Sequence, residues 1–209
     1  MAPTRREERA LQRRGFLRVA GLDEVGRGPL AGPLVAAAVI LPSDLRASWL
    51  SKVRDSKELS EKGRERLFGP IVQAAVATGI GVVQPQEIDA LGISAANRLA
   101  MLRAKDSLAV APDYLLIDAV HLEEAGIPFK AIIHGDALCL SIAAASIVAK
   151  VTRDRTMRVL DSLYPGYGFA QHKGYPTPSH MEALRKLGPS PIHRRSFRPV
   201  AELLGETRG

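Results

Sequence analysis

The chain has 209 residues, 46% of them hydrophobic, and a formal net charge of +7. This length suits one α/β core, and the single cysteine, Cys139, excludes an internal disulfide and a thiolate zinc cluster and fits a reducing cytoplasm. The first segment carries Glu7 and Glu8 without an apolar region, which argues against a secretory signal, and no stretch approaches the roughly 20 apolar residues of a membrane span. We therefore expect a cytoplasmic location, and the basic charge favours a polyanionic partner. A monomer is also expected, although no sequence feature indicates it.

Residues 1–18 form a basic N-terminal arm. Two structures are open for it: a helix from Thr4, or disorder in the absence of a ligand. No role in chemistry is assigned to it. Its basic residues are Arg5, Arg6, Arg9, Arg13, Arg14 and Arg18.

Residues 19–26 and 34–41 predict two buried strands that pair antiparallel. Asp23 and Glu24 end the first strand, beside a tight turn at residues 26–29. Clustered carboxylates are costly to bury unless a cation compensates them, and hard divalent cations prefer oxygen ligands. Residues 26–31 also match the dinucleotide fingerprint, but a strand follows them instead of the required helix. A surface turn with solvated acids is the alternative for this stretch taken alone.

The middle of the chain predicts alternating helices and strands. We expect a helix from Ser60 to about Ala77, a strand at residues 79–84, and one helix beginning at Pro85 with an apolar face. The polar residues of that last helix are expected to be solvated: Asn97, Arg98, Arg103 and Lys105.

Two further strands, at residues 114–117 and 129–133, are each followed by an acid, Asp118 and Asp136. A carboxylate at the C-terminal end of a buried strand is a common ligand position in α/β domains. A long helix follows at residues 140–163, and Ser146, Lys150 and Asp154 share one of its faces. Two interpretations of Lys150 and Asp154 stay open: an ordinary surface ion pair, or part of a site.

The C-terminal part contains a loop of aromatic, glycine and basic residues at positions 167–176, a mixture typical of nucleic-acid contacts. A helix capped by Thr177 is expected to end before Gly188. The histidines His172 and His180 are expected to be structural. Residues 190–200, which include His193, Arg194 and Arg195, are expected to form a basic flap.

The acids Asp23, Glu24, Asp118 and Asp136 all lie at strand ends, and their convergence would create a magnesium site for phosphodiester hydrolysis. Adjacent residues of a regular strand point to opposite faces. Asp23 and Glu24 can therefore serve one site only if the backbone distorts or Glu24 uses its extra reach. The sequence does not decide between these two arrangements.

From Val19 to Val200 the chain resembles ribonuclease HII, the type 2 ribonuclease H family. The resemblance rests on an ordered series of motifs: residues 21–33 (GLDEVGRGPLAGP), 55–60 (DSKELS), 117–119 (IDA), 135–136 (GD), 141–154 (SIAAASIVAKVTRD), 167–169 (YGF), 172–175 (HKGY) and 193–197 (HRRSF).

The resemblance implies a ribonuclease H-like fold, with a mixed central sheet flanked by helices and a C-terminal helical extension. The chain would divide into the arm at residues 1–18, a catalytic domain at 19–163 and a substrate-contacting extension at 164–209. It would hydrolyse the RNA strand of RNA–DNA hybrids and incise duplex DNA 5′ of a single ribonucleotide, leaving 3′-hydroxyl and 5′-phosphate ends. The implied cofactor is Mg²⁺ or Mn²⁺, with two ions when substrate is bound.

By position, the resemblance assigns three groups of site residues. The metal-site and catalytic carboxylates are Asp23, Glu24, Asp118 and Asp136. The residues whose backbone would recognise the 2′-hydroxyl are Gly26, Arg27 and Gly28, and Tyr175 would stack on the deoxyribose that follows. Phosphate or site-supporting contacts are Lys57, Ser146 and Lys150. Two alternatives remain: a type 1-like ribonuclease H acting only on longer hybrids, and a non-catalytic RNA–DNA hybrid-binding protein.

Overall fold

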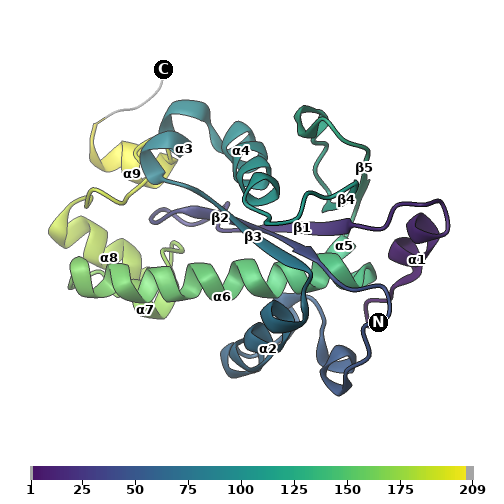
Figure 1. Ribbon diagram of the computed structural model, residues 1–209. Coiled ribbons are helices and arrows are strands. Elements are labelled where there is room, and N and C mark those ends of the chain that lie inside the picture. The colour runs from purple at the N-terminus through teal and green to yellow at the C-terminus, as the bar shows by residue number, and fades with distance from the viewer. Residues whose placement is uncertain (1, 206–209) are drawn as a thin grey trace.

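The computed structural model describes residues 2–205 of the chain. Its centre is a five-stranded mixed sheet with strand order β3-β2-β1-β4-β5 (Figure 1). The strand β1 pairs antiparallel with β2 and parallel with β4; β2–β3 is antiparallel and β4–β5 parallel. The predicted α/β class and the predicted antiparallel pair are confirmed. The strands are β1 (Val19–Val25), β2 (Leu34–Ile40), β3 (Ala77–Val83), β4 (Tyr114–Asp118) and β5 (Phe129–Ile132).

Helices cover both faces of the sheet. In Figure 1, α3 and α4 lie on one side of the sheet, and the long α6 lies on the other, with α2 beside it. The helix α6 spans Leu140–Leu163, as predicted. The other helices are α1 (Arg6–Gln12), α2 (Glu61–Ala74), α3 (Pro85–Leu91), α4 (Ile93–Asp106), α5 (Gly135–Leu138), α7 (Phe169–His172), α8 (Pro178–Leu187) and α9 (Arg198–Leu203).

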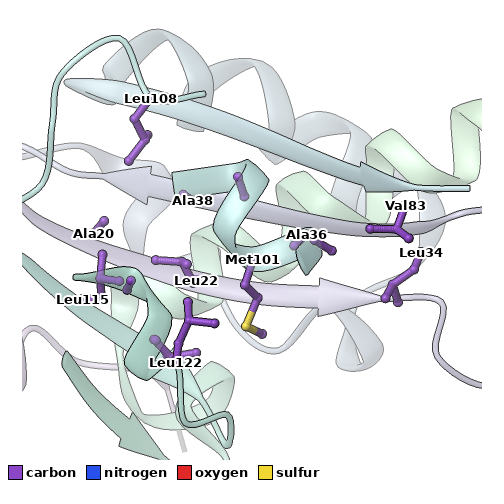
Figure 2. Packing of buried hydrophobic residues seen from close by; sticks show 14 of the residues in the cluster. Ala20, Leu22, Leu34, Ala36, Ala38, Val83, Met101, Leu108, Leu115 and Leu122 are labelled. Atoms are coloured by element: carbon purple, nitrogen blue, oxygen red, sulfur yellow. The ribbon is translucent and has the colours of Figure 1, made fainter. Parts of the chain in front are cut away.

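The strand β2 is buried along its whole length because its alternate residues face opposite helices. Ala36 packs in the cluster that contains Met101 of α4, and Figure 2 shows this layer. Ala37 packs instead in the cluster that contains Ile147 of α6. The continuous apolar run in the sequence therefore supplies two separate hydrophobic layers.

Glycines in the strands allow both helices to lie close to the sheet. A Cβ on Gly21 of β1 would lie 2.2 Å from the carbonyl carbon of Ser141 in α6, and one on Gly81 of β3 would lie 1.9 Å from the carbonyl oxygen of Ala100 in α4. Both neighbours are backbone atoms, which cannot rotate away. A larger residue would therefore push the helix off the sheet.

The boundary predicted between α2 and β3 was wrong. The helix ends at Ala74, and the strand begins at Ala77 instead of residue 79. The reason is pairing with β2: Ala77 and Thr78 lie in register with Ile40 and Val39. Pairing between these two strands, which are distant in the sequence, overrides the local helical preference of an alanine-rich stretch.

The single helix predicted from Pro85 was also wrong. Gly92 has φ 75° and separates α3 from α4, because only glycine adopts this conformation without strain. The break rotates α4 relative to the preceding helix. Asn97, expected on a solvated face, is consequently buried, with 3% of its surface exposed.

Both ends of the described chain pack onto the core. The arm forms α1, which begins at Arg6, and Leu11 packs there with Tyr114 and the buried Cys139. Around α8 and α9, Leu184 and Val200 pack against Leu30, which follows the turn after β1. Met1 and residues 206–209, which belong to the predicted arm and extension, lie outside the described residues. Within residues 2–205, none of the helices has the length and apolarity that crossing a membrane requires.

Candidate active site

Three of the four predicted acids converge at one edge of the sheet. Asp23 belongs to β1, Asp118 is the last residue of β4, and Asp136 lies in α5, which follows β5. Because β1 and β4 are parallel neighbours, their C-terminal ends reach the same edge. One carboxylate oxygen of each residue lies within 4.8 Å of one from the other two. The predicted convergence therefore holds for these three side chains.

Glu24 lies on the other face of β1. Asp23 and Glu24 stay in register with Ala37 and Ala36 of β2, so the backbone does not distort there. Asp23, opposite Ala37, faces α6, and Glu24, opposite Ala36, faces α4. Of the two arrangements left open by the sequence, the distorted backbone is therefore excluded. Glu24 can serve the acid site only through the greater length of its side chain.

The Glu24 carboxylate is close enough to Asp23 and Asp118 to interact with both electrostatically. Burial raises the pKa of Glu24, and the charge of Asp118 adds to this, while Arg27 and the Asn97 amide lower it. One oxygen accepts from Arg27 at 3.5 Å. The other, Oε2, is buried and has no hydrogen-bond partner among the described residues. An unpartnered buried carboxylate oxygen is a suitable cation ligand.

The aspartates are also held in a state that favours a bound cation. Burial, followed by the charge of Glu24, raises the pKa of Asp23 well above its usual value. Burial also raises the pKa of Asp118, against a hydrogen bond of 2.7 Å that the Gly135 amide donates to it. Both shifts come from desolvated, mutually repelling carboxylates. A divalent cation would relieve them, and oxygen ligands suit Mg²⁺ or Mn²⁺.

Lys57 reaches this cluster from a short turn after β2. Its ammonium lies 3.4 Å from Asp136, and its side chain is 79% exposed, so it stays available to a ligand. Burial is the largest single influence on the pKa of Lys57 and lowers it, but the carboxylates of Asp55, Asp136 and Asp23 together outweigh burial and raise this pKa. The turn itself is closed by Asp55, which accepts from the Lys57 amide at 2.9 Å.

The Lys57 turn is fastened by buried polar contacts. Ser146 of α6 donates to Ser56 at 2.9 Å, which connects the turn to the helix beside Asp23. Arg64 of α2 donates to the carbonyls of Ser56 and Leu59, at 2.8 and 2.6 Å. The sequence did not reveal this role of Arg64, since the two carbonyls that it binds in the turn are backbone atoms.

The predicted role of Lys150 is not evident in the geometry. Its ammonium donates to Asp154 at 2.7 Å, and Arg64 lies 3.6 Å from the second oxygen of Asp154. The pair is not at the surface either, since Asp154 is 2% exposed. Burial lowers the pKa of Lys150. Its phosphate contact stays a prediction.

The connection between β1 and β2, residues 26–33, is held by two buried arginines, Arg153 of α6 and Arg194, both 0% exposed. Arg194 donates to the carbonyls of Gly26 at 2.7 Å, Arg27 at 3.1 Å and Gly32 at 2.9 Å. Arg194, expected in a basic flap at this surface, is therefore buried and holds the loop instead. Its charge is desolvated, and burial lowers its pKa to about 9.

Arg153 fastens the second half of the same loop. It donates to the carbonyls of Pro33 at 2.9 Å and Lys173 at 3.0 Å, joining the loop to the C-terminal extension. Sequence reasoning missed this residue, although a signal exists. Arg153 lies four residues from Ala149 and from Met157, both buried, and so shares the inward stripe of α6.

Tyr175 and Gly28, predicted to act together, lie side by side. A Cβ on Gly28 would lie 3.7 Å from the Tyr175 ring, and the amide of Leu30 donates to Gly174 at 2.8 Å. Tyr175 is 40% exposed although it is aromatic. An exposed ring beside a bare backbone is a suitable surface for a nucleotide.

Two buried histidines, His180 and His193, support the backbone at Tyr175 through hydrogen bonds. A carbonyl oxygen only accepts, so His180 donates from Nδ1 to Tyr175, at 2.9 Å. His193 accepts from the Ser190 amide at Nδ1, so its Nε2 donates to His180, at 3.1 Å. Burial lowers the pKa of His193 to about 4, which keeps the ring neutral. These positions and the stacking of His172 on His180 agree with the structural role expected for both.

The chain is similar in sequence to known proteins of one family. Residues 20–200 match the family model described as Ribonuclease HII. The chain is 52% identical to ribonuclease HII of Dehalococcoides mccartyi over 204 residues, covering 98% of this chain and 96% of that protein. It is 55% identical to ribonuclease HII of Desulfitobacterium hafniense over 199 residues, covering 95% and 75%.

The fold is similar to the crystal structure of ribonuclease H2 from Pyrococcus horikoshii OT3. The TM-score is 0.71 at 30% identity, covering 89% of this chain and 96% of that chain. The predicted ribonuclease H-like fold is confirmed. The chain belongs to the ribonuclease HII family and is a ribonuclease H, a hydrolytic endonuclease.

Proposed function

We propose that this protein hydrolyses the RNA strand of RNA–DNA hybrids and incises duplex DNA 5′ of a single embedded ribonucleotide, leaving 3′-hydroxyl and 5′-phosphate ends. One observation carries the proposal. The loop at residues 26–28, with Tyr175 against it, directly follows the strand that delivers Asp23 and Glu24 to the acid cluster. A nucleotide bound by the loop would thus have its phosphate close to the acids.

The residues present fit divalent cations. Asp23, Asp118 and Asp136 supply converging oxygens, and the unpartnered oxygen of Glu24 extends the set. Two bound Mg²⁺ or Mn²⁺ ions would supply activation of a water and stabilisation of the leaving oxygen. Lys57, 3.4 Å from Asp136 and mostly exposed, would contact a phosphate of the bound strand.

Recognition of RNA would come from the loop and Tyr175. A protein distinguishes RNA from DNA at one position by the 2′-hydroxyl. Gly26, which is buried, adopts φ 98° and allows the chain to turn there, and Gly28 is exposed and carries no side chain, so the backbone at Gly28 is accessible to that hydroxyl. Arg194 engages the carbonyls of Gly26 and Arg27 on the buried side, which fixes the orientation of the loop. Tyr175 would stack on the deoxyribose that follows.

Cleavage of a labelled DNA duplex with one ribonucleotide tests the proposal. It is measured with Mg²⁺, Mn²⁺ or EDTA, beside an all-DNA duplex and a long RNA–DNA hybrid. We expect metal-dependent incision 5′ of the ribonucleotide. Cutting of the long hybrid alone would support a type 1-like activity instead, and binding without cleavage of either would support a hybrid-binding protein. A monomeric state and a cytoplasmic location stay predictions.

Two pairs of variants separate the roles of the residues. Asp118→Asn should abolish cleavage, and full activity of this variant would refute the metal mechanism. Its control is Asp161→Asn, in the last turn of α6, which should retain cleavage. Tyr175→Ala should lose incision at the ribonucleotide while keeping duplex binding, and Tyr175→Phe should retain incision because it keeps the ring. Equal loss of binding and incision in Tyr175→Ala would make this residue an anchor for the duplex only.

A further inference from the structure

The outer face of α1 carries three arginines. Arg6, Arg9 and Arg13 are spaced by three and four residues, which places them on one side of the helix and its C-terminal end, and all three are exposed. Their side chains make no hydrogen bond or ion pair with any residue in the described range 2–205. We call these three residues the arginine face. Like charges at this spacing repel, so the face is unfavourable unless an anion binds it.

The surroundings of the arginine face differ from those of an ordinary charged surface. An open hollow of about 420 Å³ lies there, lined by Thr4, Arg5, Arg6, Arg9 and Arg13, with no acid among them. The hollow between α2 and α6 is the contrasting case. It is lined by Glu61, Lys62, Glu65, Arg66, Arg155 and Arg158, and its acids pair with Arg155 and Arg158 at 2.6 to 3.0 Å. Within the described residues, Lys62 and Arg66 are left without an ion pair there, whereas the first hollow has no acid at all in its lining.

The helix that carries the arginine face is rigidly attached. The carboxylate of Glu8, 8% exposed, accepts from the amide and the hydroxyl of Ser141 at the start of α6, both at 2.8 Å. Arg5 donates to the carbonyls of Pro42 and Ser43, at 2.8 and 2.9 Å. A flexible solvated terminus would need neither contact. These contacts instead hold the three arginines at a fixed place on the molecule.

That place adjoins the acid cluster. The amide of Thr4 donates to the carbonyl of Leu138 at 2.9 Å, and Leu138 is the last residue of α5, the helix that carries Asp136. Figure 1 shows α1 beside α5, at the end of the molecule opposite α8 and α9. Tyr175 lies just before α8, at that opposite end. A duplex that contacts Tyr175 and the acid cluster, and is longer than the distance between them, can therefore extend toward α1.

We propose that the arginine face binds the phosphate backbone of duplex DNA flanking the ribonucleotide, as a second contact outside the acid cluster. The inference rests on the proposed function, because it takes the duplex bound at the acids as the ligand. Arginines bind phosphates through paired N–H donors, and each neutralised phosphate releases condensed counterions. The contact would strengthen binding without regard to sequence.

The test is the salt dependence of duplex binding by Arg9→Gln/Arg13→Gln. Binding is measured in EDTA, over a series of salt concentrations, to a long all-DNA duplex and to the same duplex with one ribonucleotide. The slope of log K against log salt should be about 2 units smaller in magnitude than for the wild type, at about 0.9 per phosphate contact. The matched control, Lys62→Gln/Arg66→Gln, removes the same charge from the α2 hollow and should keep the wild-type slope.

Glutamine is a good helix former, and Arg5 and Glu8 remain, so the variant should unfold at the wild-type temperature. On duplexes trimmed to the few base pairs around the ribonucleotide, variant and wild type should have equal slopes. Equal slopes on the long duplex, or a difference that persists on the trimmed one, would overturn the proposal. Incision by the wild type is scored separately, so its absence would refute the proposed function without deciding the arginine face.

Discussion

Replacing the buried Arg194 with methionine should destabilise the protein and impair incision together. Its guanidinium donates to the carbonyls of Gly26, Arg27 and Gly32, and it is fully buried. Methionine fills similar space but donates nothing. The three carbonyls would then lose their buried partner, and the loop before Gly28 would lose its attachment to the C-terminal segment.

The magnitude follows from two opposing effects. Each buried acceptor left unsatisfied costs about 1–3 kcal/mol, whereas removing a desolvated cation returns part of that cost. The lowered pKa of Arg194, about 9, shows that this return is substantial. We expect a net loss of about 3 kcal/mol in the free energy of unfolding. For a domain of this size that corresponds to a decrease in Tm of about 6–12 °C.

Thermal unfolding and incision of the single-ribonucleotide duplex at 25 °C measure the two effects. The neighbouring Arg195 is exposed, so Arg195→Met should change the free energy of unfolding by less than about 0.5 kcal/mol. Arg194→Met should incise at least about tenfold more slowly at a temperature where it is folded, because the loop is displaced. If both variants lose the same stability, or if Arg194→Met stays fully active, the buried contacts do not position the loop.

Three further predictions concern other contacts. Gly21→Ala should lower Tm, because its Cβ would lie 2.2 Å from the backbone of α6. Gly69→Ala in α2 should raise Tm, because its Cβ would have no neighbour within 4 Å and alanine is the better helix former; a decrease for both variants would contradict the packing argument. Burial lowers the folded-state pKa of His193 from the usual 6.5 to about 4, so its contribution to stability is complete above pH 6.5 and is lost as the pH falls toward about 4, by about 3 kcal/mol; denaturant titrations should show a smaller pH dependence in His193→Gln. Arg64→Met should slow incision in the wild type but not in a Lys57→Ala background, because Arg64 acts by fastening the Lys57 turn; additive losses would refute that coupling.

Much of the fold follows from local sequence patterns. The buried run that forms β2, the long helix α6 and the cap of α8 at Thr177 were predicted because periodicity and capping residues act over a few positions. The convergence of Asp23, Asp118 and Asp136 was also predicted, because strand ends in an α/β sheet meet at one edge.

The remaining features depend on contacts between distant segments. The start of β3 depends on pairing with β2, and the break at Gly92 decides which face of α4 buries Asn97. The contacts of Arg153 and Arg194 were missed because their partners are backbone carbonyls, which carry no sequence signature. The one local signal was the place of Arg153 on the buried stripe of α6. A charged residue is usually solvated, and only tertiary structure shows where buried carbonyls compensate it. Sequence alone thus determined the strands, the main helices and the acids, whereas tertiary structure decided which polar residues are buried to position them.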